Sequence, residues 1–101
     1  MLSPRSKEAF EKVNNLVTQE FKVKVDDLCS RIRTKTIVEA KFVAWYVLHT
    51  EYRRAFVVIG QMYGNKHYTT IGNGVNRVRN NQDLLSMAKK ISDILNENKQ
   101  Q

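Results

Sequence analysis

The sequence contains one proline and one cysteine, and it has no long apolar run. A single cysteine excludes an intrachain disulfide, and its apolar neighbours predict that Cys29 is a buried structural thiol. No uncharged stretch reaches the roughly 18 residues of a membrane span, and the N-terminus lacks the apolar segment of a signal peptide. We therefore expect a cytoplasmic protein that makes no membrane contact.

Recognisable catalytic and metal-binding patterns are also missing. The two histidines, His49 and His67, and the one cysteine cannot supply three or four metal ligands at a familiar spacing. Gly60, Gly64 and Lys66 have the wrong spacing for a phosphate loop, and nothing marks a nucleophile turn. We expect neither an enzyme nor a bound metal, cofactor or small-molecule substrate.

Carboxylates are absent from one interval of the chain. All ten acidic residues lie outside residues 52–82, although the whole chain carries a net charge of +7. The interval holds five basic residues, which are Arg53, Arg54, Lys66, Arg77 and Arg79. A second basic cluster comprises Arg31, Arg33, Lys35 and, further on, Lys41. A solvated basic surface is common on any protein, but a charge of this size and distribution favours nucleic acid as the partner.

Apolar residues at helical spacing predict an all-α fold, a compact bundle of about six helices in one domain over residues 1–101. The first helix is expected over about 4–20, after a Ser3 cap. One or two helical turns follow over about 26–30. The remaining helices are expected over about 36–51, 55–63, 67–80 and 83–97.

Two local signals refine this outline. The spacing from Thr36 to Glu39 predicts a capping box at the start of the central helix, which carries Trp45 in the core. Gly64 is the expected left-handed stop of the helix before it. The two helices on either side of Gly64 therefore form a predicted helix-turn-helix over about residues 55–80.

The second helix of this pair is polar on its outward side. Short groups that both donate and accept hydrogen bonds occupy Thr69, Thr70, Asn73, Asn76 and Asn80. A helix in the major groove of DNA needs such groups, and it needs no carboxylates facing the phosphates. Gly72 and Gly74 cost roughly 1 kcal/mol each relative to alanine inside a helix. We expect close packing against a neighbouring helix to explain one of them.

The segment IGQMYGNKHYTTIGNGVNRV, residues 59–78, resembles a known family signature. It is similar to the C-terminal domain of the bacterial replication initiator DnaA, whose signature is approximately I-G-x-x-F-G-x-R-D-H-[ST]-T-V-x-x-A-x-x-x-I. The matching residues are Ile59, Gly60, Gly64, Thr69 and Thr70. The similarity continues through the upstream helices and covers roughly residues 13–97.

The resemblance implies a Trp-repressor-like helix-turn-helix fold. It also implies sequence-specific binding of a short DnaA box in double-stranded DNA, linked to replication initiation or its regulation, by a nucleoid-associated protein. The ATPase module that precedes this domain in the initiator is absent from the sequence. The initiator's ATP hydrolysis and origin melting are therefore not expected of this chain.

The resemblance also assigns site residues. It places a basic loop, about residues 30–36, in the minor groove through Arg33, and it assigns Lys41 to the DNA backbone or a base. It assigns Lys66, His67, Tyr68, Thr69 and Thr70 to the major groove. With the neighbouring polar and basic groups, the expected DNA-binding set is Arg31, Arg33, Lys35, Lys41, Lys66, His67, Tyr68, Thr69, Thr70, Asn73 and Arg77.

Departures from the family pattern leave the specificity open. The family's Arg-Asp-His is Lys66-His67-Tyr68 here, and its Pro-Arg-Gln is residues 40–42, Ala-Lys-Phe. His67 lacks the carboxylate that could accept from cytosine N4, and it could instead donate to guanine or to a phosphate.

Two alternatives to sequence-specific duplex binding remain. The chain could be an interaction module for replication proteins, or a phage or mobile-element regulator with altered or lost box specificity. It could also bind RNA, since Tyr52, Tyr63 and Tyr68 could stack on bases. Packing inside or at the edge of the core is the favoured role for Tyr52 and Tyr63.

Overall fold

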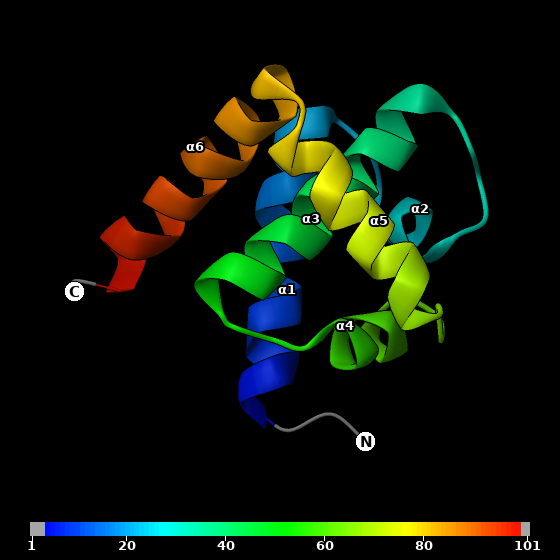
Figure 1. Ribbon diagram of the computed structural model, residues 1–101. Coiled ribbons are helices and arrows are strands. Elements are labelled where there is room, and N and C mark those ends of the chain that lie inside the picture. The colour runs from blue at the N-terminus through cyan, green and yellow to red at the C-terminus, as the bar shows by residue number, and fades with distance from the viewer. Residues whose placement is uncertain (1–3, 100–101) are drawn as a thin grey trace.

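The computed structural model describes residues 4–99, which fold into six α-helices without a strand (Figure 1). The helices are α1 (Pro4–Phe21), α2 (Val25–Cys29), α3 (Lys35–Glu51), α4 (Phe56–Met62), α5 (Tyr68–Arg79) and α6 (Gln82–Lys99). Every predicted helix is present, with its ends shifted by at most about two residues, as is usual for helix boundaries. Ser3, the expected cap of the first helix, lies outside the described residues.

Helix α3 is the centre of the fold. Helices α1, α5 and α6 all pack against it, and Figure 1 shows them arranged around it. Its buried residues occupy most of its circumference, which is the pattern of a helix enclosed by others. Trp45 is only 2% exposed, which confirms its predicted place in the core.

The helix-turn-helix consists of α4, α5 and the turn between them. Gly64 has a φ of +86° and Asn65 a φ of 60°, so two consecutive residues adopt the left-handed conformation that reverses the chain. The turn then folds back on α4, because the Lys66 N–H donates to the Gly60 carbonyl oxygen at 2.9 Å. A side chain at Gly60 would not fit, since an added Cβ would lie 2.1 Å from the Lys66 carbonyl oxygen.

Close packing explains a glycine in α5, as predicted. A Cβ on Gly74 would lie 2.6 Å from Cε3 of Trp45 and 2.7 Å from Cδ1 of Phe42, so α5 approaches α3 more closely than any larger residue allows. Gly72 is less constrained, because a Cβ added there would lie 3.2 Å from the nearest atom, in the Phe56 ring.

Two expectations about local structure are wrong. Helix α3 begins at Lys35 with Thr34 as its N-cap, so Thr36 is inside the helix and forms no capping box. The Val38 N–H donates to the Thr34 carbonyl oxygen at 2.9 Å, which extends the helix one residue earlier. Cys29 is exposed, not buried, because the short helix α2 turns Leu28 towards the core instead.

Length and hydropathy together argue against a membrane span within residues 4–99. None of the helices there is both long enough and apolar enough to cross a bilayer.

Candidate nucleic-acid interface

The basic loop connects α2 to α3 and is held in one shape by hydrogen bonds. Lys41, nearly two turns into α3, donates from Nζ to the carbonyl oxygens of Ser30 at 2.6 Å and Ile32 at 3.1 Å. The Ser30 hydroxyl accepts from the Ile32 N–H at 3.2 Å and donates to the Asp27 carbonyl oxygen at 2.7 Å. The two arginines of the loop, Arg31 and Arg33, remain exposed on this fixed backbone.

Lys41 supports the loop from beneath. It is 6% exposed, and burial lowers the pKa of its ammonium group, with a further contribution from the positive charge of Lys66. The resemblance assigned Lys41 to the DNA backbone or a base. In the structure its ammonium donates to the loop carbonyls and so helps to position Arg31 and Arg33. The assignment of Lys41 to DNA stays a prediction.

The start of α5 presents four of the expected residues to solvent, namely His67, Tyr68, Thr69 and Thr70. His67 is the N-cap, and its Nδ1 accepts from the Thr69 N–H at 3.2 Å. When Nδ1 is the acceptor in a neutral imidazole, the proton is on Nε2, so the outward nitrogen is a donor. The Tyr68 side chain is 53% exposed, and its ring centroid lies 4.4 Å from that of His67.

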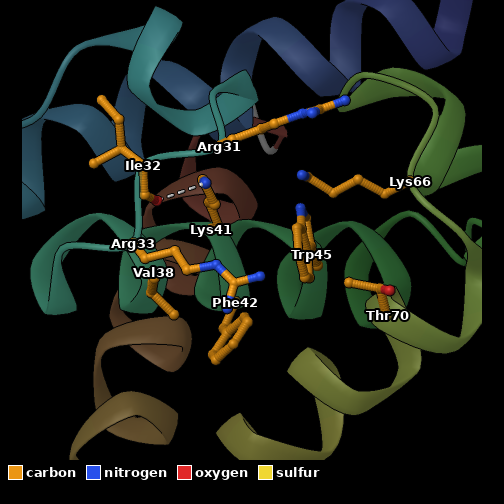
Figure 2. Close-up of a pocket in the computed structure, with 9 residues that line it drawn as sticks. All are labelled: Arg31, Ile32, Arg33, Val38, Lys41, Phe42, Trp45, Lys66 and Thr70. Atoms are coloured by element: carbon orange, nitrogen blue, oxygen red, sulfur yellow. Dashed lines mark hydrogen bonds between the residues drawn. The ribbon is translucent and has the colours of Figure 1, made fainter.

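A cleft of about 650 Å³, here called the loop cleft, separates the basic loop from the start of α5 (Figure 2). It is lined by Arg31, Ile32, Arg33, Val38, Lys41, Phe42, Trp45, Lys66 and Thr70. The cleft therefore brings together five of the expected DNA-binding residues from two distant parts of the chain. None of these lining residues carries a carboxylate.

Two neighbouring clefts continue along the same face. One, of about 520 Å³, follows α5 and is lined by Phe42, Thr70, Asn73, Gly74, Asn76, Arg77 and Asn80. The other, of about 280 Å³, is lined by Arg33, Lys35, Val38, Glu39, Phe42, Arg77, Asn81 and Leu84. His67, Tyr68 and Thr69 line none of these three clefts and lie at the exposed start of α5.

The interval without carboxylates does not form one acid-free surface. Arg54 lines a different cleft, beside Glu8 and Glu51. Glu39, from outside the interval, lies in the cleft that contains Lys35 and Arg77. The acid-free surface is therefore narrower than the sequence indicates, and it is concentrated between the basic loop and α5.

Sequence reasoning missed several residues that shape this face. Ile32 is 44% exposed between the two loop arginines, and Phe42 lines all three clefts. Trp45 was assigned only to the core, yet it also lines the loop cleft. The polar edge of an indole ring is the one signal that could have indicated this second role.

Side chains of the metal-ligating types do not cluster in the part of the chain from Pro4 to Lys99. No group of three or more histidine, cysteine, aspartate or glutamate side chains there could hold an ion.

The model of the bacterial DnaA protein helix-turn-helix family matches residues 10–78. The chain belongs to this family. Among curated proteins, the chromosomal replication initiator protein DnaA of Bdellovibrio bacteriovorus is 38% identical over 85 residues, which are 83% of this chain. The DnaA proteins of Thermomicrobium roseum and Brucella abortus are 33% and 31% identical, each over 84% of the chain. The resemblance drawn from residues 59–78 is thereby confirmed.

The DnaA-family chain spans only a small part of these relatives. It covers 18% of the Bdellovibrio and Thermomicrobium proteins and 16% of the Brucella protein. A crystal structure of a DNA replication initiation factor shares the fold, with a TM-score of 0.75 and 20% identity. That match covers 87% of this chain and 29% of the other, and it confirms the predicted all-α helix-turn-helix bundle.

Proposed function

We propose that this DnaA-family domain binds duplex DNA sequence-specifically, with α5 in the major groove and the basic loop in the adjacent minor groove. Its role would lie in replication initiation or the regulation of initiation, at the nucleoid. One observation carries the proposal: the basic loop and the start of α5 frame a single cleft that contains Arg33, Lys66 and Thr70 and is lined by no carboxylate.

The exposed side of α5 has the chemistry of a helix that reads base edges. Thr69, Asn73 and Asn76 are exposed on α5, and each side chain can both donate and accept hydrogen bonds. The first turn of such a helix normally meets the bases. His67 has its acceptor nitrogen occupied by the Thr69 N–H, so it presents a donor and suits guanine O6 or N7 better than cytosine N4.

The basic loop has the properties of a minor-groove reader. Arg33 is exposed, and the backbone on either side of it is held by Lys41 and by the start of α3. A narrow A·T-rich minor groove has an enhanced negative potential that attracts an inserted arginine. A loop on a fixed backbone loses little further conformational freedom when it enters such a groove.

The test is the salt dependence of duplex affinity. About five or six phosphate contacts would lower the affinity by on the order of a thousandfold between about 50 and 200 mM salt. The target site is selected first from a pool of random duplexes, and the affinity of that site is then measured against ionic strength. Lys89→Met on α6 is the control, since Lys89 is exposed on a helix that contributes only Leu84 to the three clefts.

The outcomes separate this proposal from its rivals. A selected site with a steep salt response supports sequence-specific duplex binding. No enrichment and a flat salt response would remove it and favour an interaction module for replication proteins. Tighter binding of single-stranded RNA than of any duplex would favour the RNA alternative, in which Tyr68 stacks on a base.

A further inference from the structure

The indole nitrogen of Trp45 is a buried hydrogen-bond donor without an acceptor. The residue is 2% exposed, and its ring is enclosed by Gly74, Phe42 and Tyr63. Among the described residues, Nε1 has no hydrogen-bond partner. Buried donors are almost always paired in folded proteins, so each exception calls for an explanation.

The position of this nitrogen indicates what is missing. Trp45 lines the loop cleft, and Figure 2 shows Nε1 directed to the side on which Lys41 and Lys66 lie. In the same view Arg33 and Lys66 extend towards the middle of the cleft from opposite sides. The Lys66 ammonium has no hydrogen-bond or ion-pair partner among residues 4–99, whereas that of Lys41 is used by the loop carbonyls.

The residues that line the cleft include four cations and no carboxylate. Burial first, then the charge of Lys66 and, more weakly, that of Arg33 lower the pKa of Lys41. Cys29 and Asp27, which do not line the cleft, act in the opposite direction, and the pKa of Lys41 is lowered on balance. Donors outnumber acceptors there, since Thr70 carries the one hydroxyl among the lining side chains. An anion with several oxygens would relieve the repulsion and accept from the indole N–H.

We propose that the loop cleft is a phosphate-binding site, in which Trp45 Nε1–H and the Lys66 ammonium donate to the oxygens of one phosphate. The inference rests on the proposed function, because it identifies this phosphate as one of the DNA backbone, between the groove read by the basic loop and the groove read by α5. A backbone phosphate held in the cleft would then fix where the basic loop and α5 lie along the duplex.

The experiment tests whether the contribution of Trp45 to duplex affinity depends on one particular phosphate. Duplexes of the selected site are made with one neutral methylphosphonate at a time, and their affinities are measured for the wild type and for Trp45→Phe. At one position, neutralisation should weaken wild-type binding roughly tenfold. It should weaken binding by the variant clearly less, because only the Lys66 contact to that phosphate is then left to lose. Replacement of Trp45 by β-(3-benzothienyl)alanine, which keeps the ring shape and lacks the N–H, gives the same comparison without a change of volume.

Salt dependence distinguishes the two donors. Lys66→Met should lower the slope of log affinity against log salt by about one phosphate contact, because a charge is lost. Trp45→Phe should lower affinity with an unchanged slope, because the indole N–H is neutral. Thermal unfolding followed by circular dichroism verifies that each variant is folded.

A free phosphate ion is the other source of the same chemistry. Trp45 is the only tryptophan, so its fluorescence reports directly on the cleft. Titration with inorganic phosphate, against chloride at equal ionic strength, tests this source. A shift of the emission without coupling to any duplex position would assign the site to a free phosphate and overturn the DNA assignment.

The remaining outcomes separate the inference from the function on which it rests. Wild-type affinity in both Trp45 variants, with no coupled position, would overturn the inference and leave duplex binding intact. A wild-type protein that binds no duplex would remove the proposed function and the DNA assignment together.

Discussion

Helices α1 and α5 both pack against α3, and their buried sides are alike. Val13 and Val17 face the core from α1, and Ile71, Val75 and Val78 face it from α5. A stripe of this kind at helical spacing is what either helix needs in order to pack on α3.

The exposed sides of the two helices differ in charge pairing. On α1, Glu8 and Lys12 form an ion pair at 2.8 Å, which lowers the pKa of the Glu8 carboxyl through a hydrogen bond and the nearby charge. Glu20 pairs with Lys90 of α6 at 2.9 Å. Helix α5 carries Arg77 and Arg79 but no carboxylate.

Of the two sides of a helix, the exposed side carries more information about function. The buried stripe is required by the fold, so it is similar in both helices. The exposed side is little constrained by folding, since surface substitutions away from special features usually change stability by less than about 0.5 kcal/mol. An exposed side with basic groups, amides and no carboxylates therefore reflects what the helix binds.

The largest expected effect concerns α3, against which both α1 and α5 pack. Trp45→Ala should cost roughly 3 to 5 kcal/mol in the free energy of unfolding, because it empties a site that α5 covers through Gly74. Thr69→Ala, on the exposed side, should change stability by less than about 0.5 kcal/mol and should weaken binding. Denaturant midpoints in the reverse order would show that the buried and exposed sides are wrongly assigned.

The second prediction divides the exposed surface between its two readers. His67→Ala and Tyr68→Ala should each alter preference at a few adjacent base pairs by roughly 1 to 3 kcal/mol. Arg33→Ala should reduce affinity and relax the preference over A·T-rich flanking positions only. The measurement is the affinity of each variant for all single-base variants of the selected site in one buffer.

A contrary result would be equally informative. If the Arg33 and His67 variants lose discrimination at the same positions, the two readers are not separate. If both lose affinity equally for every sequence, only a general electrostatic attraction remains.

The third prediction concerns the link between α1 and the helix-turn-helix. The Tyr63 hydroxyl, at the end of α4, donates to Asn14 Oδ1 of α1, and complete burial raises the pKa of Tyr63 well above its usual value. The unfolded phenol ionises near pH 10, whereas the folded one stays neutral. Stability from this group is therefore complete below about pH 10 and declines above it, by up to about 1.4 kcal/mol per pH unit.

The measurement compares the wild type with Tyr63→Phe. The difference in their free energies of unfolding, followed from about pH 8 to 11, should shrink as the pH rises. A difference that does not change with pH would mean that Tyr63 ionises equally easily in both states.

The smallest predicted effects compare the ends of α1 and α4. Both helices are followed by a left-handed residue, Lys22 with a φ of 57° after α1 and Gly64 with a φ of +86° after α4. Gly64→Ala should cost roughly 1 kcal/mol, and Lys22→Gly should gain up to about that amount, because only glycine adopts this conformation without strain. Thermal denaturation of the two variants should shift the midpoint in opposite directions.

Much of the fold could be predicted because its signals are local. The valine stripe of α1, the apolar run of α3 and the Gly64 stop each depend on residues near in sequence. The prediction of a cap at Thr36 failed because a second threonine lies two residues earlier. Thr34 is the N-cap in the structure, and its side chain makes no capping hydrogen bond. The prediction that Cys29 is buried failed because a helix of five residues is too short for its apolar pattern to define which side faces the core.

The candidate site was predictable as a set of residue types but not as a geometry. Lys41 has the same sequence signal as the exposed basic residues, yet it is buried under a loop that begins eleven residues earlier. The second role of Trp45 depends on Lys66, which is distant in sequence and is brought near by the turn after α4. Neither arrangement follows from spacing, because both arise from tertiary packing.

The attachment of the basic loop to Lys41 has a thermodynamic consequence for DNA association. Since two carbonyls of the loop are held by a buried ammonium, the conformational entropy of shaping the loop is lost during folding. The protein would therefore search DNA with Arg31 and Arg33 already on a formed backbone. Removal of the Lys41 donors would transfer that entropy loss to the binding step, where calorimetry would record it as a less favourable binding entropy.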